Sequence, residues 1–416
     1  MKKSVVKFFQ FVAIFSLLFL AACSGSAIDS SSGSDDSGKE SEVDSKDPVK
    51  LGFILSLTGN FASMGTPVKE GIELYFEENP EIDGRKIELF FEDDAGDPQA
   101  ALRKYEQLTL NQGVHIVGGG TVGSIALALR DKVDTDKKVP LINVVGSTDV
   151  LSWEKKSDYA WRTSFSAWQY ASISGKYTAE AVGKNAVIIA SDYVAGHEIV
   201  TDFIPSFEEG GGKVKEIIWA PLGTSDFSSY LTQIDNAKPE AVFMFIPGAD
   251  GSRLVKQYQE FGLQDKYTLV EGGSLLNAPF NVKAVGNAVV GGKMITNYFP
   301  ELKNEVNEKF VKSYQAKFNK IPDNYVVNGY DTGNLIAQVV GEAGSLDGEK
   351  VVSVLKEGLT LDSPRGPIEM NPDTHTLNQN MYVIEGKEAN GEISFELIKT
   401  YENIEMPKEN VGYKKY

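Results

Sequence analysis

From Val49 onward the chain alternates short apolar runs with segments whose apolar residues recur at helical spacing, and the whole rhythm occurs twice. The apolar runs, which we interpret as strands, lie at 49–55, 86–91, 114–117, 140–145, 186–190, 214–219, 241–246 and 267–270. Such alternation predicts a mostly parallel sheet with helices on its faces. Because one core rarely covers a chain of 416 residues, the double set predicts an α/β fold with two Rossmann-like lobes.

Local signals refine this outline in three places. Pro205 lies inside a helix expected at 197–209, which should therefore kink or end there. A strand near 289–296 leads to further helices, which are predicted at 304–318 and 330–343. Near the C-terminus, Asn390-Gly391 favours a tight turn between two strands and predicts a hairpin.

Two turns at the ends of predicted strands are candidates for ligand contact, because ligands bind outside the carboxyl ends of parallel strands. Gly118–Gly123 matches G-x-G-x-x-G, but it follows the third strand and no acidic residue closes the next one, so a dinucleotide is not favoured. The N–H groups of the helix that follows would suit a carboxylate, helped by Thr121 and Ser124. Gly146–Asp149 presents further hydroxyl and amide groups. A plain turn or helix start without ligand is the alternative for both.

The sequence contains no pattern typical of a catalytic or metal site. The three histidines are scattered, with no HExxH motif, and neither G-x-S-x-G nor GxxxxGK[ST] occurs. The acidic residues within 92–97 lack the spacing of a calcium loop, so we interpret them as a solvated loop with Asp97 as a helix cap. We therefore expect no catalytic residues, no metal and no cofactor. A secreted hydrolase is the remaining enzymatic alternative.

The first residues predict export and attachment to a membrane. Three lysines precede an apolar run at 8–20 and then small residues, which indicates a signal peptide over 1–22. Leu20-Ala21-Ala22-Cys23 resembles a bacterial lipobox, in which the cysteine is lipidated and becomes the first residue of the mature protein. Cys23 is the only cysteine in the chain. We expect an extracytoplasmic protein anchored to the bacterial membrane through Cys23; plain cleavage beside an incidental cysteine is the alternative.

The segment 23–47 is rich in Ser, Gly, Asp and Glu and poor in apolar residues, which predicts a flexible tether. As a coil it would reach roughly 25–30 Å. The formal net charge is −17, and it becomes −20 once the three leader lysines are removed. This balance argues against nucleic acid as a partner.

Several segments together resemble the branched-chain amino acid/amide-type (leucine-binding-like) solute-binding proteins of ABC importers, which have the type I periplasmic binding protein fold. The segments are Leu55–Gly59 with Met64-Gly65 and Gly71, then Asp93–Pro98, then Asp192-Tyr193 with Gly196. A narrower resemblance is to the subgroup that binds aromatic acids and other non-leucine solutes. It rests on Pro221–Phe227, Gly248–Asp250, Asp362–Pro367 and Asn371–His375.

The resemblance implies a site formed by both lobes. First-lobe contacts to a carboxylate or amide would come from Met64, Thr121, Val122, Ser147 and Thr148. Second-lobe contacts would come from Trp168, Tyr193, Gly248 and Glu271. The chain departs from the amino-acid binders at Gly273, where they place an acid for the ammonium group, and at Gly248, where they often place an aromatic residue. Glu271 is a candidate replacement for that acid, and both departures make room for a bulkier solute.

The resemblance also implies a mechanism and partners. Lobe 1 would comprise 49–167 plus 299–365, and lobe 2 would comprise 168–298 plus 366–404, with crossing strands near 165–168, 296–299 and 364–367 as a hinge. A ligand that bridges the lobes would favour a closed state, which the permease and ATPase components would recognise. A sensor of the same fold is an alternative. Amino acids, amides, aromatic acids and short-chain organic acids all remain open as solutes.

Overall fold

The computed structural model of the chain describes residues 47–274 and 276–410. The predicted signal peptide, the predicted lipidation site Cys23 and the predicted tether apart from Asp47 lie outside the described residues. Within the part described, no helix has both the length and the apolar character needed to cross a membrane.

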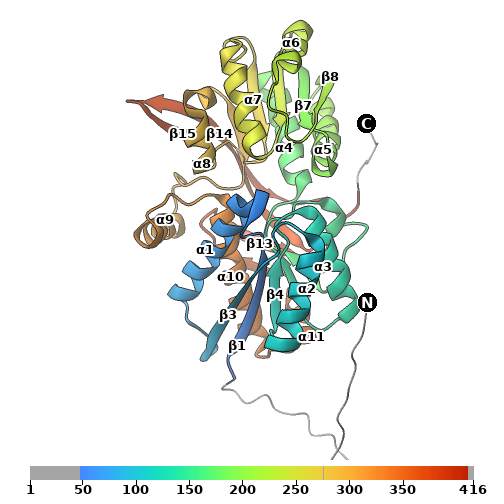
Figure 1. The fold of residues 1–416 in the computed structure, drawn as a ribbon, viewed down its shortest axis with the longest axis vertical. Coiled ribbons are helices and arrows are strands. Elements are labelled where there is room, and N and C mark those ends of the chain that lie inside the picture. Colours follow the sequence, from blue (N-terminus) through green and yellow to red (C-terminus); the bar gives the residue numbers. More distant parts are fainter. Residues whose placement is uncertain (1–46, 275, 411–416) are drawn as a thin grey trace, which may run out of the picture. The chain divides into compact units, whose positions relative to one another are not determined.

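The first sheet has six strands in the order β2-β3-β1-β4-β5-β6, and all of its pairings are parallel except β2 with β3. The strands are β1 Val49–Leu55, β2 Glu81–Ile82, β3 Arg85–Asp93, β4 Ile116–Gly119, β5 Leu141–Asn143 and β6 Ala160–Arg162. Helices cover both faces (Figure 1). One face packs against α1 Ala62–Glu78, α10 Asn324–Ala343 and α11 Gly348–Glu357, and the other against α2 Pro98–Glu106 and α3 Gly123–Asp136.

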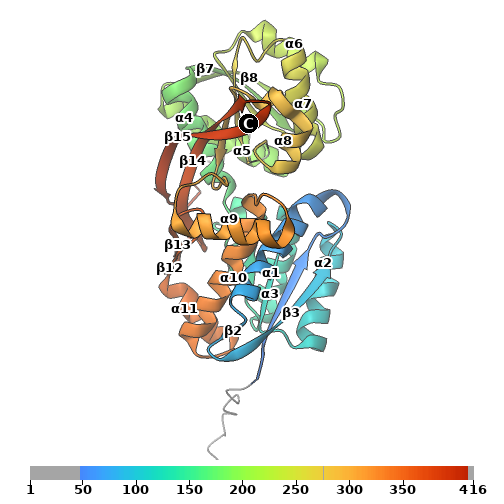
Figure 2. The same ribbon diagram turned by 90° about the vertical axis from the view of Figure 1, so that its left-hand side faces the viewer.

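The second sheet has nine strands, of which β8-β7-β9-β10-β11 are parallel neighbours and the rest antiparallel. They are β7 Asn185–Ser191, β8 Lys213–Ala220, β9 Ala241–Phe245, β10 Thr268–Gly272, β11 Lys293–Thr296, β12 Leu359–Leu361, β13 Ile368–Asn371, β14 Thr376–Ala389 and β15 Glu392–Ile404. Its faces carry α4 Ala167–Tyr177 and α5 Val194–Glu209 on one side, and α6 Ser228–Ala237, α7 Gly248–Glu260 and α8 Pro279–Val285 on the other. The predicted hairpin is confirmed as β14 and β15 (Figure 2). The predicted α/β fold with two mostly parallel sheets is therefore correct.

Three chain segments connect the hydrophobic core of the first sheet with that of the second. The first is 163–166, between β6 and α4, and the second is 297–304, between β11 and α9 Glu305–Phe318. The third is β14 itself, because Leu377 packs in the core of the first sheet and Met381 in that of the second. This passage lies further along the chain than 364–367, where the sequence suggested it.

Helix boundaries follow local capping except where long-range packing overrides it. Asp97 caps α2 as predicted, with its side chain accepting a hydrogen bond from Gln99 N–H. The helix expected at 330–343 starts earlier, at Asn324, because Asp323 accepts hydrogen bonds from the next N–H groups. The helix α5 does not stop at Pro205 but continues to Glu209, since its buried face packs closely on α4. The expectation that it could end at Pro205 was wrong.

Candidate functional site

The two predicted first-lobe turns lie together at the carboxyl ends of β4 and β5. Gly146 N–H donates to Gly120 O over 2.8 Å, and Gly120 has a positive φ of 86° that suits glycine. A Cβ on Gly123 would lie 3.5 Å from the Thr148 side chain, so Thr148 sits against the start of α3. The structure thus brings Val122, Ser147 and Thr148 into one neighbourhood.

The N-terminus of α3 has no side-chain cap. Its N-cap residue is Val122, in extended conformation, and the valine side chain has no atom that could accept a hydrogen bond. The first N–H groups of any helix lack partners within the helix and carry partial positive charge. Ser166 caps α4 and Asn304 caps α9, whereas α5 and α7 also start without a side-chain cap. The start of α3 is therefore suited to an anionic group.

Thr121 and Met64 help to build this edge. Thr121 is fully buried, and its Oγ1 accepts a hydrogen bond from Ser56 N–H over 3.0 Å at the end of β1. Met64 is in the first turn of α1 and packs partly buried on the core of the first sheet. The next residue, Gly65, lies so close to the Ser56 backbone that a Cβ would come within 2.2 Å of its carbonyl oxygen.

The acidic segment after β3 supports the same edge and is only partly solvated. Asp93 accepts hydrogen bonds from the N–H groups of Leu57 and Thr58. Asp94, which we interpreted as part of a solvated loop, is fully buried and accepts a hydrogen bond from Ser56 Oγ over 2.6 Å. Burial raises the pKa of Asp94, although the Ser56 bond opposes this. The loop is not fully solvated, because Asp93 and Asp94 accept hydrogen bonds from the residues that follow β1.

A buried acidic cluster joins the Thr148 loop to α5 of the second lobe. Thr148 Oγ1 donates to Glu198 Oε1 over 2.6 Å, and Asp149 accepts a hydrogen bond from Trp168 N–H over 3.0 Å. Burial first, and then the charges of Asp202 and Glu198, raise the pKa of Asp149 well above its usual range. Burial likewise raises the pKa of Asp202. Burial therefore makes Asp149 and Asp202 release their protons at higher pH than exposed carboxyl groups do.

One arginine is buried beside these acids. The guanidinium of Arg162 donates to the carbonyl oxygens of Ser147, Thr148 and Phe165, at 3.1–3.3 Å. Burial lowers its pKa to about 10, while Asp149 and Glu198 oppose this effect. Sequence reasoning missed this cluster. The signal was the pair Glu198 and Asp202, four residues apart on the apolar face of a helix.

The predicted second-lobe residues occupy strand exits, with different surroundings. Tyr193 is the N-cap of α5, and its ring is nearly parallel to that of Phe245, at 8° with centroids 6.4 Å apart. Trp168 is half-buried in the first turn of α4. Gly248 is exposed at the start of α7, and a Cβ there would meet nothing within 4 Å. No described contact brings Gly248 to the other predicted residues.

Glu271 is fully buried at the end of β10. A Cβ on Gly273 would lie 3.0 Å from Glu271 Oε1 and 2.9 Å from the Phe245 ring. The missing side chain at position 273 thus leaves space that the Glu271 carboxylate and Phe245 use. Tyr325, which sequence reasoning missed, is buried on α10. Burial first, then the charge of Asp323 and more weakly those of Tyr170, Glu271 and Tyr193, raise the pKa of its hydroxyl.

An open groove of about 620 Å³ lies elsewhere, beside the β14–β15 hairpin. Phe299, Tyr382 and Leu397 are among its lining residues. None of the predicted ligand-binding residues lines this groove, so it does not bear on the candidate site.

Comparison with known proteins agrees with this architecture. The family model described as "Periplasmic binding protein" matches residues 48–392. Leu/Ile/Val-binding protein homolog 6 of Brucella abortus (strain 2308) is 27% identical over 363 residues, which cover 86% of this chain and 92% of that protein.

Two solved structures are similar along almost their whole length. One is a solute-binding protein of an ABC transporter from Rhodopseudomonas palustris BisB5, in complex with 3,4-dihydroxybenzoic acid. It matches with a TM-score of 0.79 and 30% sequence identity, and the match covers 87% of this chain and 99% of that protein chain. The other is a solute-binding protein of an ABC transporter from R. palustris HaA2, in complex with p-hydroxybenzoic acid. It matches with a TM-score of 0.80 and 26% sequence identity, and the match covers 88% of this chain and 100% of that protein chain.

Such proteins bind small solutes outside the cytoplasm for ABC permease and ATPase components, and they are not enzymes. The chain belongs to the periplasmic binding protein family, as an ABC transporter solute-binding protein of the leucine-binding type.

Proposed function

We propose that this protein is a lipoprotein that captures a small carboxylate- or amide-bearing solute by closing its two lobes and presents it to an ABC importer. The observation that carries the proposal is the uncapped start of α3, next to the hydroxyl-bearing loop Ser147–Thr148. A carboxylate would complete the hydrogen bonding of that helix terminus and be stabilised by its partial positive charge. Met64 and Thr121 would shape this end of the site from the exits of β1 and β4.

The opposite end of the solute would meet the second lobe. Tyr193 and Phe245 offer aromatic faces, and the Glu271 carboxylate beside Gly273 offers an acceptor. A solute with a donor group at this end, either an ammonium group or a phenolic hydroxyl, could donate a hydrogen bond to that acceptor. Two relatives were solved with hydroxylated benzoic acids, which supports an aromatic acid, while the curated relative named for Leu, Ile and Val supports an amino acid. Trp168 and Gly248 complete the proposed second-lobe set.

The solute class is tested by a thermal-shift screen of purified residues 24–416. The compounds are benzoate, 4-hydroxybenzoate, 3,4-dihydroxybenzoate, leucine and phenylalanine. A solute at 100 times its Kd should stabilise the protein by about 2.7 kcal/mol. Benzoate is the control for the donor group, because it has the carboxylate and ring but no hydroxyl. If every compound, and then a wider set of carboxylates and amides, leaves the melting temperature unchanged, the proposal is wrong.

The role of the α3 terminus is tested by Val122→Asp. An aspartate N-cap would occupy the first N–H groups and repel a carboxylate, so the affinity for the best solute should fall at least tenfold, about 1.4 kcal/mol. The matched control is Val306→Asp, which adds the same charge on a partly exposed position of α9. Thr148→Ala should also weaken binding. Unchanged affinity in both Val122→Asp and Thr148→Ala would remove this loop pair from the site.

Lobe closure and lipid anchoring need separate tests. We predicted lobe 1 as 49–167 plus 299–365 and lobe 2 as 168–298 plus 366–404, but the packing of Leu377 in the core of the first sheet supports a last boundary within β14. Crosslinking the lobes in an open arrangement should abolish binding of the best solute. For the anchor, Cys23→Ala should move the protein from the membrane fraction to the soluble extracytoplasmic fraction of expressing cells. A variant that stays with the membrane would contradict the anchor but would leave the solute-binding proposal standing.

A further inference from the structure

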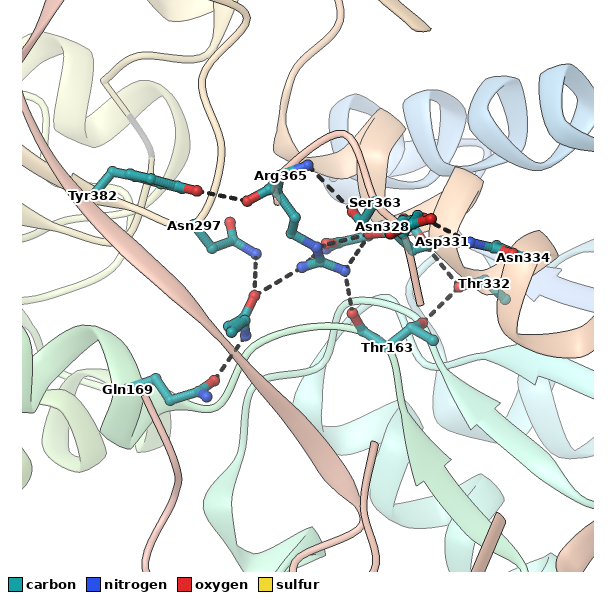
Figure 3. Close-up of polar contacts among 12 residues, drawn as sticks. Thr163, Gln169, Asn297, Asn328, Asp331, Thr332, Asn334, Ser363, Arg365 and Tyr382 are labelled. Carbon is teal, nitrogen blue, oxygen red and sulfur yellow. Dashed lines mark hydrogen bonds and ion pairs between the residues drawn. The ribbon is translucent and has the colours of Figure 1, made fainter. Parts of the chain in front are cut away.

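Arg365 lies in the turn between β12 and β13, and its side chain is fully buried. Its guanidinium donates four hydrogen bonds and forms an ion pair with Asp331 (Figure 3). Nε donates to Asp331 Oδ2 on α10 at 2.7 Å, and Nη2 lies 2.7 Å from the same oxygen. Nη1 also donates to Asn328 Oδ1 on the same helix, at 3.3 Å. The remaining hydrogen bonds go to Thr163 O at 2.8 Å and Gln379 Oε1 at 3.0 Å.

These last two acceptors lie on connections between the sheets. Thr163 belongs to the first passage, 163–166, and Gln379 lies on β14 at the third passage, between Leu377 and Met381. Gln379 Oε1 also accepts a hydrogen bond from Asn297 Nδ2 in the second passage, at 3.1 Å. One guanidinium and one amide therefore tie all three passages to α10.

The same network continues to the start of α4 and to the proposed ligand segment. Gln379 Nε2 donates to Gln169 Oε1 at 2.9 Å, within the capping box of α4. The hydroxyl of Tyr170 donates to Asn297 Oδ1 at 2.8 Å and contacts Ser274 Oγ at 2.5 Å. Ser274 follows Glu271–Gly273, so the polar network leads from the passages to a predicted contact of the solute.

Stability alone does not account for this arrangement. A fully buried ion pair loses the hydration of both ions, and well-packed apolar residues of similar size often give equal or greater stability. In addition, Asp331 Oδ1 and Asn328 Nδ2 are buried without a hydrogen-bond partner. What the guanidinium supplies that an apolar side chain cannot is a fixed geometry among several separate segments.

We infer that Arg365 is the positioning residue of the hinge: through Gln379 it holds the three passages in register with α10 and thereby sets the relative populations of the lobe arrangements. The inference rests on the proposed lobe closure. Loss of the tie should let the lobes sample a wider range of orientations and so lower the population that is competent to bind solute.

The test measures lobe geometry directly and needs no solute. Spin labels at Glu88→Cys and Gln233→Cys, in residues 24–416, report the distance between the two sheets by pulsed electron paramagnetic resonance. In Arg365→Met/Asp331→Leu the buried charges are removed together, so the urea midpoint should stay near that of the wild type while the distance distribution broadens. The matched control is Lys356→Met/Asp158→Leu, which removes an exposed ion pair of the first lobe and should leave the distribution unchanged.

A second variant guards against misfolding of the first. Gln379→Met leaves the Arg365–Asp331 pair intact but cuts the link to Asn297 and Gln169, so it should broaden the distribution in the same way. A wild-type distribution in Gln379→Met, or in a folded Arg365→Met/Asp331→Leu, would overturn the inference. If instead the wild-type distance does not respond to the best solute, the closure proposal fails, and the broadening in the variants still decides the role of Arg365.

Discussion

The helix pair α1 and α10 should be intolerant of a single added methyl group where the two backbones meet. A Cβ on Gly329 would lie 2.1 Å from Val68 O, and a Cβ on Gly71 would lie 2.0 Å from Val326 O. Since an ordinary carbon–oxygen contact is about 3.3 Å, Gly329→Ala must push the helices apart by about 1 Å. The obstacle is a backbone carbonyl, which cannot rotate away as a side chain can.

The expected cost can be worked out from two opposing effects. Overpacking of this kind destabilises by about 1–3 kcal/mol, and the rigid obstacle favours the upper end. Alanine regains about 1 kcal/mol over glycine inside a helix. Gly329→Ala should therefore lose about 2 kcal/mol of unfolding free energy, measured by urea denaturation followed by circular dichroism.

The same helix provides the control. A Cβ on Gly341 would meet nothing within 4 Å, so Gly341→Ala should be neutral or gain up to about 1 kcal/mol. Equal or greater stability of Gly329→Ala relative to the wild type would refute the reasoning. So would a loss in Gly341→Ala as large as that in Gly329→Ala, because the effect would then not come from the crossing.

Three further predictions concern titration and the candidate site. Burial lowers the pKa of His375 to about 4, so the folded state takes up its proton at lower pH than the unfolded state, and the contribution of His375 to stability should fall by about 2 kcal/mol between pH 8 and pH 5. In urea titrations, the difference in stability between these two pH values should therefore change by that amount in His375→Asn. Burial raises the pKa of Asp149 and Asp202, so their contribution has the opposite sign. Asp202→Asn should gain stability over the wild type at pH 8, and the gain should shrink as the pH falls, whereas a gain that grows towards acid would contradict the raised pKa of Asp202. Gly273→Ala should displace the Glu271 carboxylate and lower the affinity for the best solute, measured by isothermal titration calorimetry, with little change in melting temperature. Unchanged affinity would place that carboxylate outside the site.

The sequence by itself determined the architecture, because the signals for it are local. The apolar runs of strands and the periodicity of helices are patterns among neighbouring residues, and they predicted the two α/β units. The positions of the strand ends, where a ligand would bind, follow from the same strand predictions. The turn at Gly118–Gly123, the cap at Asp97 and the turn at Asn390-Gly391 depend on the backbone preferences of a few adjacent residues.

Only the tertiary structure decided which polar groups are buried and what they face. Glu198 meets Thr148 across 50 positions of sequence, and Arg365 meets Thr163 across 202. Asp94 and Arg365 have the side chains of surface residues, and nothing next to them in sequence indicates that the fold buries them. Their role follows from partners on distant segments, because a charge can be buried only where other parts of the chain arrive to hydrogen-bond it.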